Sequence, residues 1–522
     1  KKLLNVIDFW FSMGVDGMRL DAVPYLFERE GTNCENLPET HEFLKQLRSH
    51  VDSKFEDRML LAEANQWPED AAVYFGDGDE CHMAFHFPLM PKLFMAVQME
   101  NPFPIIDIMN QTPEIPYVAQ WAIFLRNHDE LTLEMVTDQE RDFMYRTYAK
   151  DRRMKINLGI RRRLAPLMDN DKRKMELMKV LLFTLPGTPI IYYGDEIGMG
   201  DNYHLGDRDG IRTPMQWSSD RNAGFSRVNP QRIYLPVIID PEFHYQSVNV
   251  EVQNHNSCSF LWWMKALIAI RSRFKSFGRG NIEFVRKDNP KVLAFLRSYE
   301  DEKILVLANL SRYAQPVTLD LQEMDGYCPI DLFSWNRFPR IRSKTPYLMT
   351  LGGFEHLIFA LVREEEEFQM TEKGDIPEIW VKDRWTDIFD DNSRTLKRRV
   401  LPQYLQKCRW YGGKSKLLHK VKIIDRIIMS QDEKRWDMLL MEVIYSDAKY
   451  DRYLMPVTLT SRDSTIARDH PQSLLALVIN NVESYLCDSI YDPDFRSMLL
   501  RMIYHGRTLR SGEGKISSQK SD

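Results

Sequence analysis

The sequence of 522 residues lacks a hydrophobic run long enough to cross a membrane, and it lacks a surplus of basic residues. Crossing a bilayer takes roughly 20 consecutive apolar residues, and no segment approaches that length. The formal net charge of −5 leaves no excess of cations to neutralise nucleic-acid phosphates. With 43% hydrophobic and 28% charged residues, the composition is typical of a globular protein that binds neither membranes nor nucleic acids.

Cysteine is also scarce, and no two cysteines form a C-x-x-C pair. In a large chain without a recognisable leader, such scatter favours reduced thiols and a cytoplasmic location over a disulfide framework. The sequence opens on Lys1 and Lys2 without an initiator Met and starts inside an amphipathic helix, so we expect the natural N-terminus to lie upstream. The six cysteines are Cys34, Cys81, Cys258, Cys328, Cys408 and Cys487.

Residues 3–271 alternate helical patterns with short apolar segments. The periodicity predicts helices over residues 38–51 and 172–183, among others. This alternation is typical of an α/β fold with a parallel sheet covered by helices. The strands expected in this sheet are 17–20, 59–62, 84–87, 122–125 and 189–192.

The pattern changes to strands alone between about residues 280 and 362, which predicts a small all-β domain. The acidic run 364–367 and the segment 374–377 predict a charged linker, although a solvated helix end explains the acidic run as well. An α+β module is expected from Trp385 onward, and a Ser-, Gly- and Lys-rich tail after Arg510 is expected to be disordered. The strands expected in the all-β domain are 292–296, 304–308 and 316–319.

Three of the expected strands are followed by carboxylates, namely Asp21, Glu63 and Asp129. Catalytic groups of a parallel α/β barrel gather at the carboxyl ends of its strands, so this shared position is informative. A helix cap or a strand-end ion pair would explain each carboxylate alone, but explains all three together less well. Retaining glycosidases need two carboxylates roughly 5–5.5 Å apart, one to attack the anomeric carbon and one to protonate the leaving oxygen.

Neighbouring side chains are suited to divide these roles. Arg19 precedes Asp21 by two residues, so both point to one face of a strand, and the guanidinium would keep Asp21 ionised. Glu63 would need a raised pKa to donate a proton, which burial or a nearby carboxylate can supply. His128 can donate a hydrogen bond to a sugar hydroxyl, and Asp129 can accept two.

Four stretches in chain order resemble motifs of the α-amylase family. They are residues 14–23, 61–64, 126–129 and 187–196. The resemblance implies that Asp21 is the nucleophile, Glu63 the general acid/base and Asp129 the transition-state stabiliser. It also implies that Arg19 and His128 contact the substrate.

Further stretches resemble the trehalose synthases within that family, and this resemblance extends over residues 1 to about 365. It implies a retaining double displacement that interconverts maltose and trehalose through a glucosyl-enzyme intermediate. The released glucose must stay, turn and attack while water is excluded, and residues 198–226 are a candidate lid, although a rigid surface loop explains them equally well. The stretches are residues 28–41, 127–133, 207–217 and 220–226.

The family resemblance also implies a calcium ion near the nucleophile loop and no organic cofactor. Its ligands here would be the backbone oxygens of Tyr25 and Leu26 and the carboxylate of Glu28, and calcium prefers such hard oxygen ligands. The family's other ligands fall in a part of the barrel that precedes Lys1.

The family's first barrel motif is not found, so we expect strands 4–8 of a TIM (β/α)8 barrel rather than the whole barrel. The expected fold is a partial catalytic barrel, an all-β sandwich of the α-amylase type and a small α+β module. A half-barrel has unpaired edges, so the isolated chain is expected to be inactive or to aggregate. The domain bounds are 1–278, 279–364, a linker at 365–384, the module at 385–510 and the tail at 511–522.

Residues 401–415 resemble the opening of maltokinase, which implies a kinase N-terminal cap and a fused or associated maltokinase as partner. Gly412-Gly413-Lys414-Ser415 is not a phosphate-binding loop, because the first glycine of that motif would fall on Cys408. We assign this module no catalytic residue.

Three other functions stay open. The first is an α-glucosidase or amylase that hydrolyses α-1,4 bonds, and the second is an incomplete barrel that only binds carbohydrate or assembles with a partner. In the third, the C-terminal module acts as a regulatory surface. Homo-oligomer formation is also left open.

Overall fold

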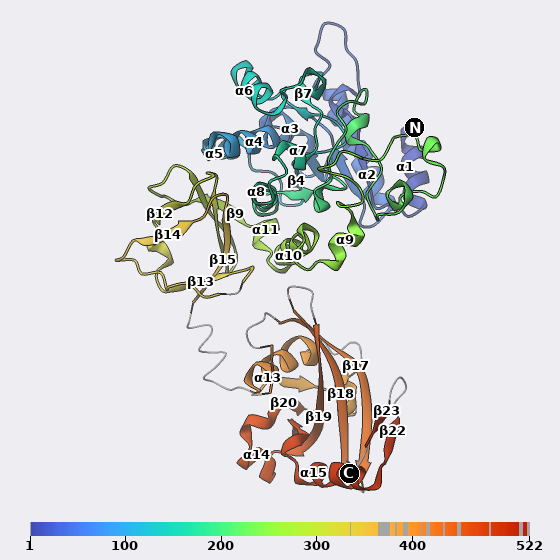
Figure 1. The fold of residues 1–522 in the computed structure, drawn as a ribbon, viewed down its shortest axis with the longest axis vertical. Helices are drawn as coiled ribbons and strands as arrows, with labels where there is room; N and C mark the ends of the chain where they lie inside the picture. Colours follow the sequence, from blue (N-terminus) through green and yellow to red (C-terminus); the bar gives the residue numbers. More distant parts are fainter. Residues whose placement is uncertain are drawn as a thin grey trace. The chain divides into compact units, whose positions relative to one another are not determined.

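The protein is described from a computed structural model, in which two compact units span Lys1–Arg363 and Glu364–Asp522 (Figure 1). The described residues are 2–334, 336–363, 376–381, 384–389, 395–408, 410–413, 418–431, 434–445, 450–479, 482–510 and 515–518. In this part of the chain, no helix is long and apolar enough to cross a membrane.

The first unit is built on a parallel sheet of five strands in the order β1-β2-β3-β4-β8. Each strand is hydrogen-bonded in parallel to the next, so the carboxyl ends of all five lie along one edge. Among the described residues, β1 and β8 are the outer strands. The strands are β1 (Gly17–Leu20), β2 (Met59–Ala62), β3 (Met83–Phe85), β4 (Gln120–Phe124) and β8 (Thr188–Ile190).

Helices surround this sheet, as Figure 1 shows for the blue to green part of the chain. Their starts follow ordinary capping chemistry: the Asp171 carboxylate accepts from the backbone N–H of Arg173 at the start of α8, and Thr137 and Glu140 form a capping box at α6. The helices are α1 (Lys2–Ser12), α2 (Pro38–Lys54), α3 (Pro68–Ala72), α4 (Leu89–Met99), α5 (Phe103–Gln111), α6 (Asp138–Tyr148), α7 (Leu164–Leu167), α8 (Lys172–Thr184), α9 (Val250–His255), α10 (Phe260–Arg273) and α11 (Ser276–Arg279).

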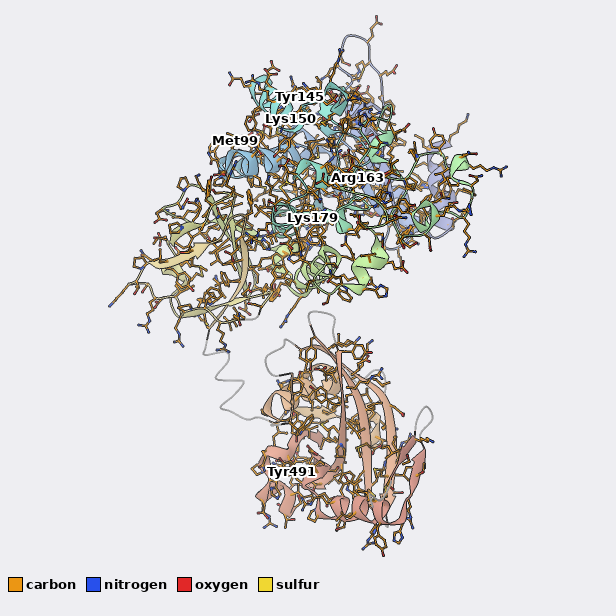
Figure 2. All side chains as sticks on the ribbon, viewed as in Figure 1. Met99, Tyr145, Lys150, Arg163, Lys179 and Tyr491 are labelled. Carbon is orange, nitrogen blue, oxygen red and sulfur yellow. The ribbon has the colours of Figure 1, made fainter. Side chains whose placement is uncertain are left out.

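The interior of this unit also holds cations, which Figure 2 labels at Arg163 and Lys179. The Lys179 ammonium lies 3.0 Å from a carboxylate oxygen of Asp195, and both side chains are buried. Arg163 donates to the backbone oxygen of Tyr193 at 2.6 Å and lies over the Tyr192 ring. These contacts offset part of the cost of burying the two charges and tie them to the segment that follows β8.

An all-β sandwich follows the helices within the same unit. Its larger sheet has the order β13-β15-β11-β10-β9, and a two-stranded sheet of β12 and β14 packs on it across a shared apolar core. The strands are β9 (Asn281–Phe284), β10 (Val292–Tyr299), β11 (Glu302–Asn309), β12 (Gln315–Leu319), β13 (Tyr327–Asp331), β14 (Tyr347–Leu351) and β15 (His356–Arg363). A small sheet of β5 (Leu131–Thr132), β6 (Lys155–Ile156) and β7 (Gly159–Ile160) lies in the first part of the unit.

The second unit contains a sheet in the order β16-β20-β21-β19-β18-β17 with helices beside it. Its core joins Leu401 and Leu405 of α13 to Leu439 and Val443 of β18. The elements are β16 (Glu378–Trp380), α13 (Leu401–Lys407), β17 (Leu418–Gln431), β18 (Lys434–Tyr445), β19 (Tyr450–Ser461), α14 (Thr465–Asp469), β20 (Leu474–Ile479), β21 (Glu483–Asp488), α15 (Pro493–His505), β22 (Thr508–Arg510) and β23 (Lys515–Ser517).

The structure differs from the sequence prediction at the C-terminus. The tail was expected to be disordered, but Lys515–Ser517 forms β23 and pairs with Thr508–Arg510. Backbone pairing with a neighbouring strand orders this polar segment without a hydrophobic run. Residues 511–514 and 519–522 of that tail, and residues 365–375 and 382–383 of the predicted linker, lie outside the described residues.

Candidate active site

The first two predicted catalytic residues, Asp21 and Glu63, directly follow the neighbouring strands β1 and β2. Leu20 and Ala62 are paired at the ends of β1 and β2, and Asp21 and Glu63 follow them directly. The Glu63 backbone N–H donates to the oxygen of Leu20 at 3.1 Å, and Val23 donates to the oxygen of Glu63 at 3.3 Å. Strand pairing therefore continues past both carboxylates and fixes where their side chains start.

One guanidinium joins the two side chains. Arg19 reaches an Asp21 oxygen at 2.8 Å with one nitrogen and contacts the carboxylate of Glu63 with another. The two carboxyl groups are also within hydrogen-bonding reach of each other. We call Arg19, Asp21 and Glu63 the shared-arginine cluster, because two acids share one cation.

The two acids of this cluster lie in different surroundings. The Asp21 side chain is 76% exposed and that of Glu63 only 15%. The hydrogen bond with Glu63, followed by the charge of Arg19, holds the pKa of Asp21 below its ordinary value. Burial, followed by the bond with Asp21, raises the pKa of Glu63. The two shifts run in opposite directions, so Asp21 loses its proton more readily than Glu63 does.

The third predicted carboxylate, Asp129, sits among cations that come from a distant loop. Arg212 donates to an Asp129 oxygen at 2.8 Å, and the Arg208 guanidinium lies 3.1 Å from the same oxygen. The His128 ring lies 3.2 Å from the other Asp129 oxygen. Asp129 and Glu63 line the same cavity.

A buried arginine holds the turn that carries Asp129. The Arg126 side chain is 1% exposed, and it donates to the backbone oxygen of Asp129 at 2.7 Å and to that of Arg162 at 2.6 Å. Arg162 in turn pairs with the carboxylate of Asp201 at 2.9 Å. These contacts hold the backbone of the turn, and the Asp129 side chain lines the cavity described next.

A cavity of about 290 Å³ opens beside these groups. Glu63, Asp129 and Arg208 line it, and its walls are mainly polar and acidic, as expected of a site for a small polyhydroxylated molecule. Its other lining residues are Ala22, Pro24, Tyr25, Asn65, Gln66, Phe87, Asn127, Glu130, Thr132 and Glu134.

The structure thus brings Arg19, Asp21, Glu63, His128 and Asp129 to one edge of the sheet. Sequence reasoning did not single out Arg208, Arg212 or Glu130, although Glu130 accepts from Arg208 at 2.9 Å at the cavity wall. The available signal was the charged stretch 207–217, which the sequence analysis interpreted as part of the trehalose-synthase resemblance and of a candidate lid, but not as a source of site residues. No local pattern shows that its arginines reach Asp129, about 80 residues earlier.

The predicted calcium ligands lie in the loop after β1. The Tyr25 hydroxyl donates to Glu35 at 2.6 Å, and Glu28 is exposed. Calcium takes about six to eight oxygen ligands, and this set offers three. The described residues contain no group of three or more His, Cys, Asp or Glu side chains placed to hold a metal ion. These residues therefore do not fit a calcium site by themselves, and the calcium assignment stays a prediction.

The six cysteines are thiols rather than disulfides in the structure.

Comparison with known protein families places the candidate active site in a recognised catalytic domain. Residues 1–280, more than half of the chain, match the alpha amylase catalytic domain. The chain belongs to the α-amylase family. Residues 282–358 match the C-terminal domain of maltogenic amylase, and residues 404–492 match the maltokinase N-terminal cap domain. The predicted order of barrel, all-β domain and kinase cap is confirmed.

The curated relatives within this family include a trehalose synthase/amylase and a trehalose synthase. The chain is 58% identical to the trehalose synthase/amylase TreS of Mycobacterium tuberculosis over 70% of this chain and 61% of that protein. It is 42% identical to the trehalose synthase of Thermus thermophilus over 98% of this chain and 54% of that protein. The chain therefore spans little more than half the length of these relatives.

A solved structure supports the fold alone. The trehalose-6-phosphate hydrolase of Bacillus licheniformis superposes with a TM-score of 0.51 at 21% identity, over 69% of this chain and 68% of that one.

Proposed function

We propose that the protein interconverts maltose and trehalose by retaining glucosyl transfer. The supporting observation is the shared-arginine cluster, in which two adjacent carboxyl groups have pKa values shifted in opposite directions. Retaining glycosidases need this division between an ionised nucleophile and a protonated acid. The trehalose synthases among the relatives support the choice of substrate.

In the proposed first step, the Asp21 carboxylate attacks the anomeric carbon of the non-reducing glucosyl unit of maltose. The bond to the leaving oxygen breaks as Glu63 gives that oxygen its proton, which releases glucose and leaves a glucosyl ester on Asp21. The Asp129 carboxylate stabilises the positive charge that develops at the anomeric carbon, and His128 and Arg19 contact the sugar.

In the second step, Glu63 takes the proton from the anomeric hydroxyl of the retained glucose. The oxygen attacks the glucosyl ester, the bond to Asp21 breaks, and trehalose forms. Two inversions restore the α configuration of the transferred unit. The loop that supplies Arg208 and Arg212 is placed to cover the cavity while the glucose turns.

The decisive experiment traps the intermediate. A fluorinated glucosyl substrate that slows the second step should leave one glucosyl group on the peptide that contains Asp21, as read by mass spectrometry after digestion. The D21N variant should carry no label. Labelling of a different residue, or no labelling in a protein that still forms trehalose from maltose, would exclude this mechanism.

Hydrolysis of α-1,4 bonds is the second candidate, and the exposure of Asp21 favours it. A glucosyl ester on a side chain that is 76% exposed can be reached by water instead of the retained glucose. The ratio of trehalose to free glucose formed from maltose separates the two reactions. Glucose without trehalose would leave only the hydrolase.

We also propose that residues 1–522 by themselves form little trehalose. β1 and β8 are the outer strands of the described sheet, whereas a closed barrel has no edges. Assay of the purified 522-residue chain with maltose tests this, and sustained formation of trehalose would contradict it. We further propose that the kinase cap couples this activity to a fused or associated maltokinase.

A further inference from the structure

A second cavity lies in the all-β sandwich, far along the chain from the candidate active site, and its volume is about 560 Å³. Three segments form its walls: residues 286–288 after β9, residues 318–322 at the end of β12, and residues 341–347 before β14. We call it the basic pocket, because Arg286, Lys287, Arg342 and Lys344 all line it.

The cations of the basic pocket exceed its anions. Its lining carboxylates are Asp288 and Asp320. Asp288 accepts from the backbone N–H of Thr318 on β12 at 2.8 Å. The nearby Asp325 carboxylate is also hydrogen-bonded, because it accepts from the backbone N–H of Ser343 at 2.6 Å. The lining therefore has a surplus of two positive charges, which is the charge of a phosphate monoester with the sign reversed.

Lys287 is the member of this group that most needs an anion. It is half-buried, its backbone bridges to Leu319, and burial lowers its pKa. Among the described residues, no carboxylate lies within ion-pair distance of Lys287 or of the three other cations of the pocket. Burying an ammonium group without a partner costs free energy, and a bound anion would recover it.

The groups around the cations suit a phosphorylated ligand of sugar size. Ser343 and Thr345 also line the pocket, and their hydroxyl groups can bind phosphate oxygens or sugar hydroxyls. The volume is about twice that of the cavity at Glu63, so it has room for more than a bare phosphate. The contrast in charge is also clear, because the first cavity is lined by carboxylates and this one by cations.

We infer that the basic pocket binds a small phosphate monoester, at a site separate from the catalytic cavity. The inference does not depend on the proposed function, because binding can be measured without turnover. Arg286, Arg342 and Lys344 contact the phosphate from the rim, while Lys287 contacts it from the wall.

Isothermal titration calorimetry on the full chain tests this inference. The ligands are glucose 1-phosphate, inorganic phosphate and maltose. One equivalent of glucose 1-phosphate should bind, and added salt should weaken it. The K287M variant, which keeps most of the aliphatic stem, should bind at least about tenfold more weakly, the loss of one charge-assisted contact. Lys303 on β11 lies outside the pocket, so K303M should bind as the unchanged protein does.

Comparing these ligands shows whether the pocket binds a phosphorylated sugar or the phosphate group alone. Tighter binding of glucose 1-phosphate than of inorganic phosphate indicates a phosphorylated sugar, and equal binding indicates a site for the phosphate group alone; both support the inference. Maltose competing for the same site would overturn it, as would the absence of saturable binding by either phosphate or unchanged binding in K287M.

Folding of the variant provides a second readout. Because Lys287 is half-buried without an anionic partner, K287M should unfold at a temperature no lower than the unchanged protein. Phosphate should raise the unfolding temperature of the unchanged protein and of K303M more than that of K287M. An equal rise in all three would contradict a site at Lys287.

Discussion

Two charge clusters in the first unit use the same kinds of side chain in opposite proportions. In the shared-arginine cluster, one guanidinium serves two carboxylates, Asp21 and Glu63. At the junction of α4 with the all-β sandwich, one carboxylate, Glu100, is served by Lys291 at 2.8 Å and Arg312 at 3.2 Å. We call this second group the Glu100 clamp.

The proportions determine how the acids titrate. In the clamp, the surrounding cations and a hydrogen bond from Ser311 overcome burial and lower the pKa of Glu100 to about 2. In the shared-arginine cluster, a single cation leaves one acid with a raised pKa and the other with a lowered one. A surplus of cations therefore lowers the pKa of the single acid, whereas one cation between two acids leaves their pKa values shifted in opposite directions.

The largest expected effect on activity comes from removing either acid of the shared-arginine cluster. In a full-length preparation that forms trehalose from maltose, D21N and E63Q should each lower kcat by about 10³-fold or more, because each removes a group that bonds to or protonates the substrate. Steady-state assays of trehalose formation measure this. D142N, a change at an exposed carboxylate of α6, should behave as the unchanged protein, and near-normal kcat in D21N would refute its role.

A smaller effect is expected from removing the shared cation. Activity requires Asp21 ionised and Glu63 protonated, so kcat/KM should fall at low pH as Asp21 gains its proton and at high pH as Glu63 loses its own. Arg19 lowers the pKa of both acids. R19Q should therefore move both limbs of the pH profile to higher pH and lower kcat by about 10- to 100-fold.

The conservative variant R19K is the control for that prediction, since it keeps the charge and should restore part of the profile. If R19Q lost activity without moving either limb, Arg19 would serve the fold alone and not the titration of the two acids.

Arg212 tests whether the distant loop belongs to the site. R212Q removes the 2.8 Å contact with Asp129 but leaves Arg208 near the same oxygen. We expect KM for maltose to rise by about tenfold, the loss of one charge-assisted hydrogen bond, with a smaller change in kcat. Substitution of Arg221 in the same loop, R221Q, is the matched control, and equal effects of both changes would count against a specific role.

The smallest effect is expected at the Glu100 clamp. E100Q should lower the free energy of unfolding at pH 7 by about 1 kcal/mol after allowance for solvent screening, without changing kcat. Because the pKa of Glu100 is depressed to about 2, its contribution is complete above the ordinary carboxyl pKa and is lost as pH falls toward 2. Urea unfolding of both proteins between pH 7 and pH 3 should show their stabilities converging, and a constant difference would contradict the clamp.

Much of the fold was predictable, because it depends on local patterns. The strands Gly17–Leu20 and Met59–Ala62 lie where the apolar segments predict them, and the other three of the sheet differ by at most a few residues at their ends. Strand ends are set by backbone pairing with a neighbour, which the sequence of one strand does not contain. For the same reason, the pairing of Lys515–Ser517 with β22 could not be foreseen.

The sequence by itself determined which residues are candidates for catalysis. It places Asp21, Glu63 and Asp129 after strands, and Arg19 two residues before the first of them, because side-chain direction along a strand alternates by rule. Only the tertiary structure decided how these groups titrate and what surrounds them. Three features depend on contacts between residues far apart in the chain. They are the burial of Glu63, the contacts of Arg208 and Arg212 with Asp129, and the clustering of cations in the basic pocket. Electrostatic free energy depends on distance and solvent exposure in the folded chain, and no local pattern encodes either.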